Sequence, residues 1–128
     1  MHWRTSLSIV VLVGALLATA SVASAVDNVG ATGRILALRV NTSASDDYGS
    51  FHGSLLIGDQ IAGITTYWWG GSRCPATTVT EQDIAMLQRA LENPRILVEP
   101  AWRTGQGGTT CLVRFTFFLR SEQGLVLP

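Results

Sequence analysis

One segment of the sequence has helical periodicity, and alternating segments precede and follow it. This order limits the folds open to the chain more than any other feature. An apolar stripe recurs at i, i+3 and i+7, formed by Ile84, Leu87 and Leu91. Thr80 or Thr78 can cap the start, each with an acid three residues later, and Asn93-Pro94 stops the helix. We therefore predict a helix over residues 80–92.

Five segments alternate or are rich in β-branched and aromatic residues, which predicts strands over residues 32–41, 51–57, 61–69, 95–102 and 109–120. Gly58-Asp59 predicts a tight turn, and Gly105–Gly108 a hairpin turn. Pro100 predicts an edge position or a bulge. In the first strand the apolar face is Leu36, Leu38 and Val40. In the last strand the expected core face is Cys111, Val113, Phe115, Phe117 and Leu119.

Three strands, a helix and two strands is the order of the OB-fold, a five-stranded, partly open barrel whose helix closes one end. We therefore expect a mainly β domain of this kind. The same order fits an α+β arrangement, in which one helix packs on an antiparallel sheet.

The N-terminal region has the layout of a cleavable signal peptide. A weakly positive start precedes an apolar run of about 12 residues, Leu7–Ala18, and Ala23-Ser24-Ala25 is a small-x-small cleavage pattern. The run is short of the roughly 20 residues that span a bilayer. No second long apolar run follows it. We predict removal of residues 1–25, leaving a single secreted or periplasmic domain over residues 26–128 with Val26 first and no membrane span.

Cys74 and Cys111 are the two cysteines of the chain, and export predicts that they form a disulfide. The alternatives are a free buried pair, a metal site or a nucleophilic thiol. The predicted mature chain has a single histidine, His52, whereas zinc would need further ligands and a thiol nucleophile would need a base. We expect no metal and no cofactor.

Composition excludes several classes of protein. Hydrophobic residues are 47% and charged residues 14%, which excludes disorder as the main state. All nine basic residues are arginine, and they balance nine acids. This charge argues against nucleic acid or an anionic membrane as the partner.

The element order, the two cysteines that flank the helix and the stretch from Leu87 to Cys111 (LQRALENPRILVEPAWRTGQGGTTC) resemble the receptor-binding B subunits of bacterial A–B toxins. The resemblance covers most of the predicted mature chain and is one of topology. It implies a binding module, because those subunits bind glycans and assemble into rings. No binding residue carries across, because no site motif matches.

The candidate site is a rim of aromatic and arginine side chains near the ends of the third and fourth strands. It consists of Tyr67, Trp68, Trp69, Arg73, Trp102 and Arg103. Alternation puts Trp68 on one face and its two neighbours on the other, so at least one ring should face away from the core. Exposed rings stack on sugars or anchor protein partners. The alternative is that one ring fills the barrel and the others cover its rim.

We therefore expect an exported, non-enzymatic module that binds a glycan or a protein through this rim. The alternative is a small secreted inhibitor or interaction protein that docks through the polar loop 41–50. A third interpretation is a small hydrolase that uses His52 with an acidic partner. Homo-oligomerisation is left open.

Overall fold

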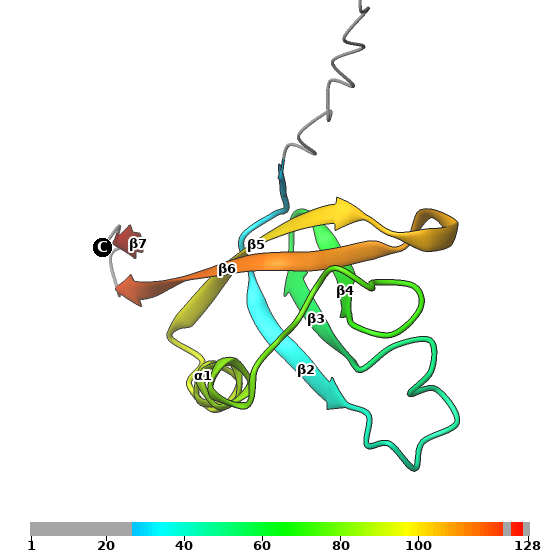
Figure 1. Cartoon of the computed structure of the whole chain (residues 1–128). Helices are drawn as coiled ribbons and strands as arrows, with labels where there is room; N and C mark the ends of the chain where they lie inside the picture. The colour runs from blue at the N-terminus through cyan, green and yellow to red at the C-terminus, as the bar shows by residue number, and fades with distance from the viewer. Residues whose placement is uncertain (1–26, 122–123, 127–128) are drawn as a thin grey trace, which may run out of the picture.

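The computed structural model describes residues 27–121 and 124–126, so the predicted signal peptide and Val26 lie outside the described residues. The elements in chain order are β1 (Asn28–Val29), β2 (Arg34–Val40), β3 (Gly53–Asp59), β4 (Gly63–Trp69), α1 (Glu81–Glu92), β5 (Ile96–Thr104), the short 3-10 turn η1 (Gln106–Gly108), β6 (Thr110–Ser121) and β7 (Gly124–Val126). Figure 1 shows that β5 and β6 form a long ribbon across the β2–β3–β4 meander, with α1 beside β2. The described part of the chain contains no helix that is both long and apolar enough to cross a bilayer.

The strands form one mixed, open sheet in the order β1-β5-β6-β4-β3-β2, and β7 pairs with β6 off this path. The expectation of five strands was wrong, because the main path has six. β1 was missed because two residues are too short to show alternation. The antiparallel alternative was also wrong in detail, since β4 and β6 run parallel where Trp68 lies opposite Cys111. A barrel is not shown: within residues 27–121 and 124–126, the bridge between this side of the sheet and β5 is the isolated pair Gly33 and Val98, just before β2.

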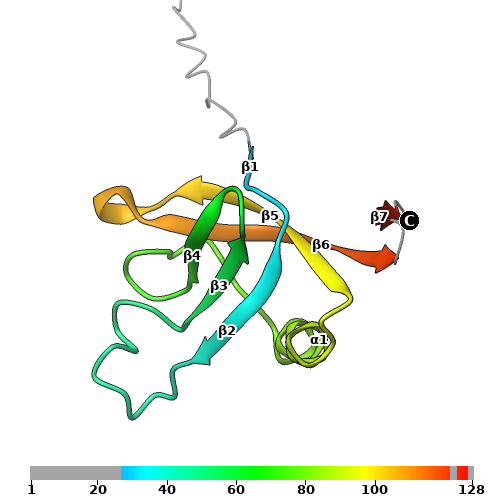
Figure 2. The ribbon, with the colours of Figure 1, turned by 180° about the vertical axis from the view of Figure 1, so that it is seen from behind.

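The helix begins and ends where the sequence predicted. The Thr80 side chain accepts from the backbone N–H of Asp83, whose carboxylate accepts from the N–H of Thr80, so a capping box starts α1. Asn93 is the C-cap. Leu87 and Ala90 are buried, and the helix contacts β2 and β5. The view from behind in Figure 2 also shows α1 beside β2.

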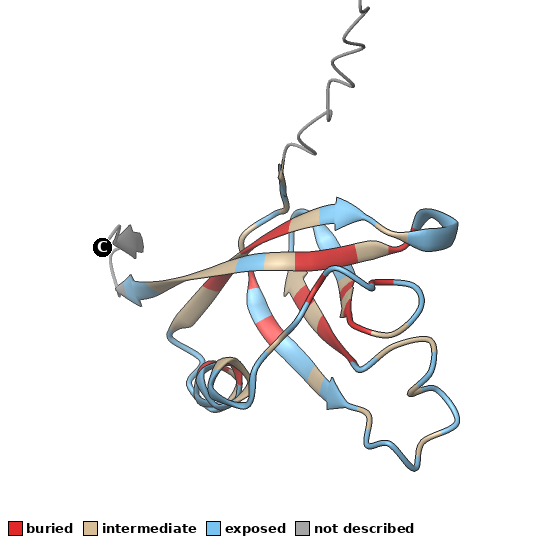
Figure 3. Cartoon of the chain, in the orientation of Figure 1, coloured by how far each residue is buried: buried red, intermediate tan, exposed pale blue. Residues whose placement is uncertain are grey.

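The core lies where the β5–β6 ribbon meets the meander and the helix (Figure 3). Its buried members come from strands on both sides and from α1: Ile35, Leu55, Ile57, Tyr67, Trp69, Leu87, Ala90, Val98 and Leu112. This apolar cluster supplies the main stabilisation of the fold, because the effect scales with the apolar area removed from water.

Two bulges change part of the expected faces of β2 and β6. Leu36 is an extra residue between Ile35 and Ala37, so Ile35 is buried while Leu36 is 46% exposed. Val113 is likewise extra between Leu112 and Arg114, which lie opposite the consecutive residues Trp102 and Ala101. Each bulge reverses the alternation that precedes it. In β6, Cys111 is buried and Phe115 and Phe117 pack against the core, as predicted. The bulge adds Leu112 to the core, and Leu119, at the far end of the strand, is 63% exposed.

The predicted turns are correct in kind and shifted in position. The β3–β4 turn covers residues 60–62, two residues later than Gly58-Asp59, and Gly63 ends it with a φ of 80° that favours glycine. The β5–β6 hairpin at η1 is confirmed. Pro100 does not lie on an edge: it faces Phe115 of β6, and its carbonyl accepts from the N–H of Gly30 at 2.8 Å. The bulge at Val113 lies beside it, across the ribbon.

Candidate functional site

The predicted disulfide is present between Cys74 and Cys111, with the two Cα atoms 5.7 Å apart. Both residues are buried, at 1% and 3% exposure. The bond ties the segment after β4 to the start of β6, next to the single position where these strands pair. It therefore fixes the segment from Cys74 to Thr78 against the β5–β6 hairpin.

Hydrogen bonds hold the two sides of this junction together. Thr77 donates through its hydroxyl to the carbonyl of Cys74 at 3.1 Å and accepts from the N–H of Gly70 at 3.2 Å. The N–H of Gln106 donates to the carbonyl of Arg73 at 2.9 Å. A Cβ on Gly105 would overlap that same carbonyl and the Cys111 sulfur. Glycine is thus required here by close approach of the hairpin to the disulfide.

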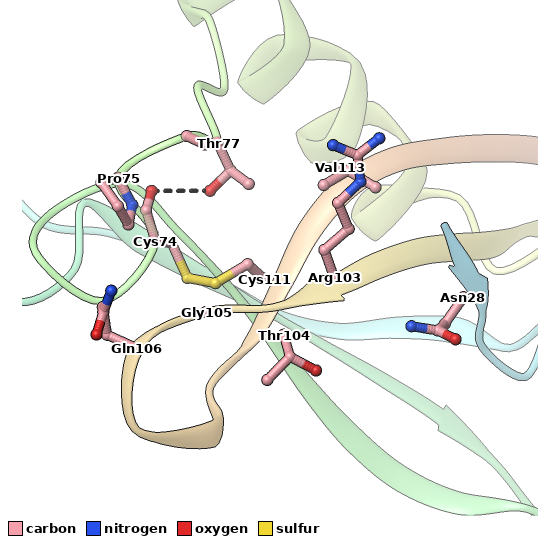
Figure 4. Close-up of a pocket in the computed structure, with 11 residues that line it drawn as sticks. Asn28, Cys74, Pro75, Thr77, Arg103, Thr104, Gly105, Gln106, Cys111 and Val113 are labelled. Carbon is pink, nitrogen blue, oxygen red and sulfur yellow. Dashed lines mark hydrogen bonds between the residues drawn. A yellow bond between two sulfur atoms is a disulfide. The ribbon is translucent and has the colours of Figure 1, made fainter. Parts of the chain in front are cut away.

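A cleft lies beside the disulfide and consists of two adjoining cavities of about 520 and 390 Å³. They share Ala76, Thr77, Arg103 and Val113 as lining residues. Figure 4 shows the disulfide between Gln106 on one side and Arg103 on the other, with Asn28 beyond Arg103. The cleft therefore offers a guanidinium, two amides and a hydroxyl over an apolar floor.

Asp27 organises the charges at the cleft. Its carboxylate accepts from Arg103 Nε at 2.7 Å and pairs with Arg114 at 3.4 Å. The three groups sum to one positive charge. Only Nε of Arg103 bonds to Asp27, so within the described residues its two terminal nitrogens have no hydrogen-bond partner. A guanidinium has five N–H donors, and four of them remain to bind a ligand.

The structure separates the six predicted rim residues into three places. Tyr67 and Trp69 are each 2% exposed and belong to the core, so their rings present no surface to a ligand. Trp68 stacks on Phe51 with ring centroids 4.2 Å apart. The Arg73 guanidinium lies over the same Phe51 ring, 5.4 Å from its centroid. Trp102 packs against the core, and Arg103 beside it lines the cleft.

Sequence reasoning missed several residues of the cleft. Asp27 and Asn28 lie at the start of the described chain, in and before a two-residue strand that has no sequence signature. Gln106 lies in the predicted turn, where it had no assigned role. No local pattern relates these residues to Arg103, because only the β1–β5 pairing brings Asn28 opposite Trp102.

The remaining chemical candidates lie outside the cleft. His52 is exposed and stacks on Tyr48, with ring centroids 4.4 Å apart. Over residues 27–121 and 124–126, no three His, Cys, Asp or Glu side chains gather into a group that could hold a metal ion. In the core, burial raises the pKa of Tyr67 above its ordinary value of 10.0, and a side-chain hydrogen bond with Thr65 partly opposes this.

The cleft thus combines a disulfide-linked wall with hydrogen-bond donors from three separate segments, β1, β5 and η1. This geometry suits the recognition of a polar ligand. Comparison with protein-family models, curated proteins and solved structures finds no match to this chain.

Proposed function

We propose that this protein is an exported, non-enzymatic module that binds a glycan or a protein through the cleft beside the disulfide. The observation that carries the proposal is the cleft itself, with the terminal nitrogens of Arg103 available at its wall. The larger of its two cavities, about 520 Å³, falls in the range of ligand sites, roughly 300–1,000 Å³.

The chemistry of the lining favours a hydroxyl-rich ligand. Arg103, Asn28 and Gln106 supply N–H donors, and the amide carbonyls of the last two supply acceptors. Trp102 adjoins Arg103 in β5 and is half-buried, so it reports on binding more readily than it stacks on a sugar. A non-catalytic role is supported by the state of the lining residues, since both cysteines are oxidised and the histidine lies elsewhere.

The fold proposal that accompanies this function is an OB-like barrel. Its support is the strand order, with β4 parallel to β6 between two antiparallel groups, and the bridge that joins the start of β2 to β5. The N–H of Gly33 donates to Val98 O at 3.0 Å, and the return bond is 2.8 Å. Such a barrel would keep the proposed kinship with the B subunits of A–B toxins, and the disulfide fits their oxidising compartment.

The test is a binding titration of the mature, oxidised protein against a glycan array and a pull-down of proteins, followed by tryptophan fluorescence with each hit. We expect Arg103→Gln to lower affinity about tenfold, the effect of one charge-assisted hydrogen bond. Arg39→Gln, an exposed arginine of β2 outside the cleft, is the matched control. Equal losses in both variants, or no hit from either screen, would reject the proposal.

The inhibitor alternative has one supporting observation, which is the order within loop 41–50. Asn41 donates through its side chain to Phe51 O at 3.0 Å, and successive turns bond Ser45 to Thr42 and Tyr48 to Ser45. The loop thus presents Asp46 and Asp47 on a defined backbone. Loss of a protein partner's binding in Asp46→Asn/Asp47→Asn, with Arg103→Gln unaffected, would favour this alternative.

A further inference from the structure

A second cavity lies at the opposite end of the β5–β6 ribbon from the disulfide. Its volume is about 480 Å³. It is lined by the start of β2, the β3–β4 turn and the far ends of the ribbon, including Gly33, Arg34, Gly58, Asp59, Ile61, Leu97 and Arg120. We call it the arginine cavity, because Arg34 and Arg120 line it from strands distant in the sequence.

The charge in the arginine cavity is unbalanced. Arg34 and Arg120 supply two positive charges against the single carboxylate of Asp59. One oxygen of that carboxylate is used by the turn, since Oδ1 accepts from the N–H of Ile61 at 2.6 Å and of Ala62 at 3.4 Å. Among the described residues the only ion pairs are those of Asp27, at the other end of the ribbon. Neither guanidinium is therefore neutralised by a described carboxylate.

A third arginine adds to this excess from across the ribbon. The N–H of Arg120 donates to the carbonyl of Arg95 at 2.7 Å, which continues the β5–β6 ladder and puts the two residues directly opposite. Like charges in directly opposite positions of an antiparallel pair destabilise it. An anion held beside Arg120 would relieve this repulsion.

Part of the cavity wall is apolar. Leu97 lines it from β5, and Ile61 is 98% exposed at its rim. The cavity is larger than a lone inorganic anion needs, so its space and its apolar wall suit the carbon skeleton of an organic ligand.

We propose that the arginine cavity is a second ligand site, which takes an anionic group carried on a sugar-sized skeleton and held by Arg34 and Arg120. The shared chemistry is that of a sulfate ester, a phosphate ester or a carboxylate, each of which matches the planar donors of a guanidinium. The site shares no residue with the cleft, so its test stands apart from that of the proposed function.

The test is calorimetric titration of the mature, oxidised protein with glucose 6-sulfate, glucose 6-phosphate, glucuronate and uncharged glucose. We expect at least one of the three anionic sugars to bind and glucose not to bind, and their order of affinity identifies the source of the anion. Arg34→Gln and Arg120→Gln should each lower that affinity about tenfold, the effect of losing one charge-assisted contact.

Arg39→Gln removes a charge from the same strand as Arg34 but outside the cavity. The affinity of this variant for the anionic sugar should therefore stay within twofold of the parent's. Amide NMR shifts on the unmodified protein provide a readout that requires no variant. They should be largest at Gly33, Gly58 and Ile61. An equal loss in Arg39→Gln, glucose binding as tightly as the anionic sugars, or shifts confined to other residues would each overturn the proposal.

A stability measurement checks the repulsion between Arg95 and Arg120. In chloride buffer we expect Arg120→Gln to unfold at the parent's temperature or above it, because a like-charge pair is removed. Millimolar concentrations of the anionic sugar that binds in the titration should raise the Tm of the parent and of Arg39→Gln but not of Arg120→Gln. The same rise in all three proteins would show that the anion acts elsewhere and would overturn the proposal.

Discussion

The two ends of the β5–β6 ribbon differ in how their arginines are paired with carboxylates. At the hairpin end, a disulfide and an ion-paired Asp27 hold Arg103 and Arg114. At the far end, Arg34, Arg95 and Arg120 gather with one carboxylate, one oxygen of which is used by a turn. The contrast teaches that arginines at the two ends differ in what they can bind. A guanidinium that is paired with a carboxylate has less charge left for a ligand than one that is not.

The largest expected effect separates the two ends through the disulfide. Replacing Cys74 and Cys111 together by alanine should lower the free energy of unfolding by about 4 kcal/mol, since the bond closes a loop with a sequence separation of 37. Urea denaturation measures this loss. The cleft should lose its ligand, whereas the folded fraction should keep anion binding at the arginine cavity. Loss of both together would show that the two ends are not independent.

Gly105→Ala tests the cleft without removing the cross-link. The new Cβ would overlap Arg73 O and the Cys111 sulfur, so the hairpin must shift, and we expect a loss of about 2 kcal/mol. Gly49→Ala is the matched control, because nothing lies within 4 Å of its Cβ position. Denaturant midpoints should fall for the first and stay unchanged for the second. Similar midpoints in the two variants would contradict the close approach.

Asp27→Asn removes the carboxylate that pairs with Arg103 and Arg114, so the arginines at the hairpin end become unpaired like those at the far end. Both ion pairs are half-exposed, so the loss in stability should stay below about 1 kcal/mol. Binding of an anionic sugar at the cleft should strengthen, and binding at the arginine cavity should not change. Calorimetry on the variant checks both. A change at the arginine cavity would refute the separation of the sites.

The smallest effect at neutral pH concerns Tyr67, in the core between the two ends. Because burial raises the pKa of Tyr67 above 10.0, the unfolded chain loses this proton at a lower pH than the folded protein. Its contribution is therefore fully present below pH 10 and is lost as the pH rises through the folded pKa. Thermal unfolding at alkaline pH should show this decline, and Tyr67→Phe should reduce it. An unchanged decline in the variant would assign the effect to other groups.

Much of the local structure could be predicted from the sequence, because its signals are local. The helix over Glu81–Glu92 follows from its stripe and caps, and each of the five predicted strands overlaps an observed one. The disulfide was predicted from two cysteines in a chain whose sequence predicts export, and it is present. The faces of β2 and β6 were predicted only in part, because one bulged residue in each, Leu36 and Val113, puts the residues before and after it out of a single alternation.

The candidate site shows the same division. Sequence reasoning grouped six rim residues by proximity along the chain, and of these only Arg103 lines the cleft. Trp68 does lie opposite to Tyr67 and Trp69, as period-two geometry requires, yet the ring it stacks on comes from the segment before β3. A pattern of alternation states which side chains share a face; it does not state which face is covered.

The chain by itself determined where its helix and most of its strands form and which two sulfurs join, because periodicity, capping and cysteine count are properties of short segments or of composition. Tertiary structure alone decided that Asp27 reaches Arg103 and Arg114, and that Arg34 shares a cavity with Arg120. These meetings depend on strand order and register, which result from packing many residues at once around a common core.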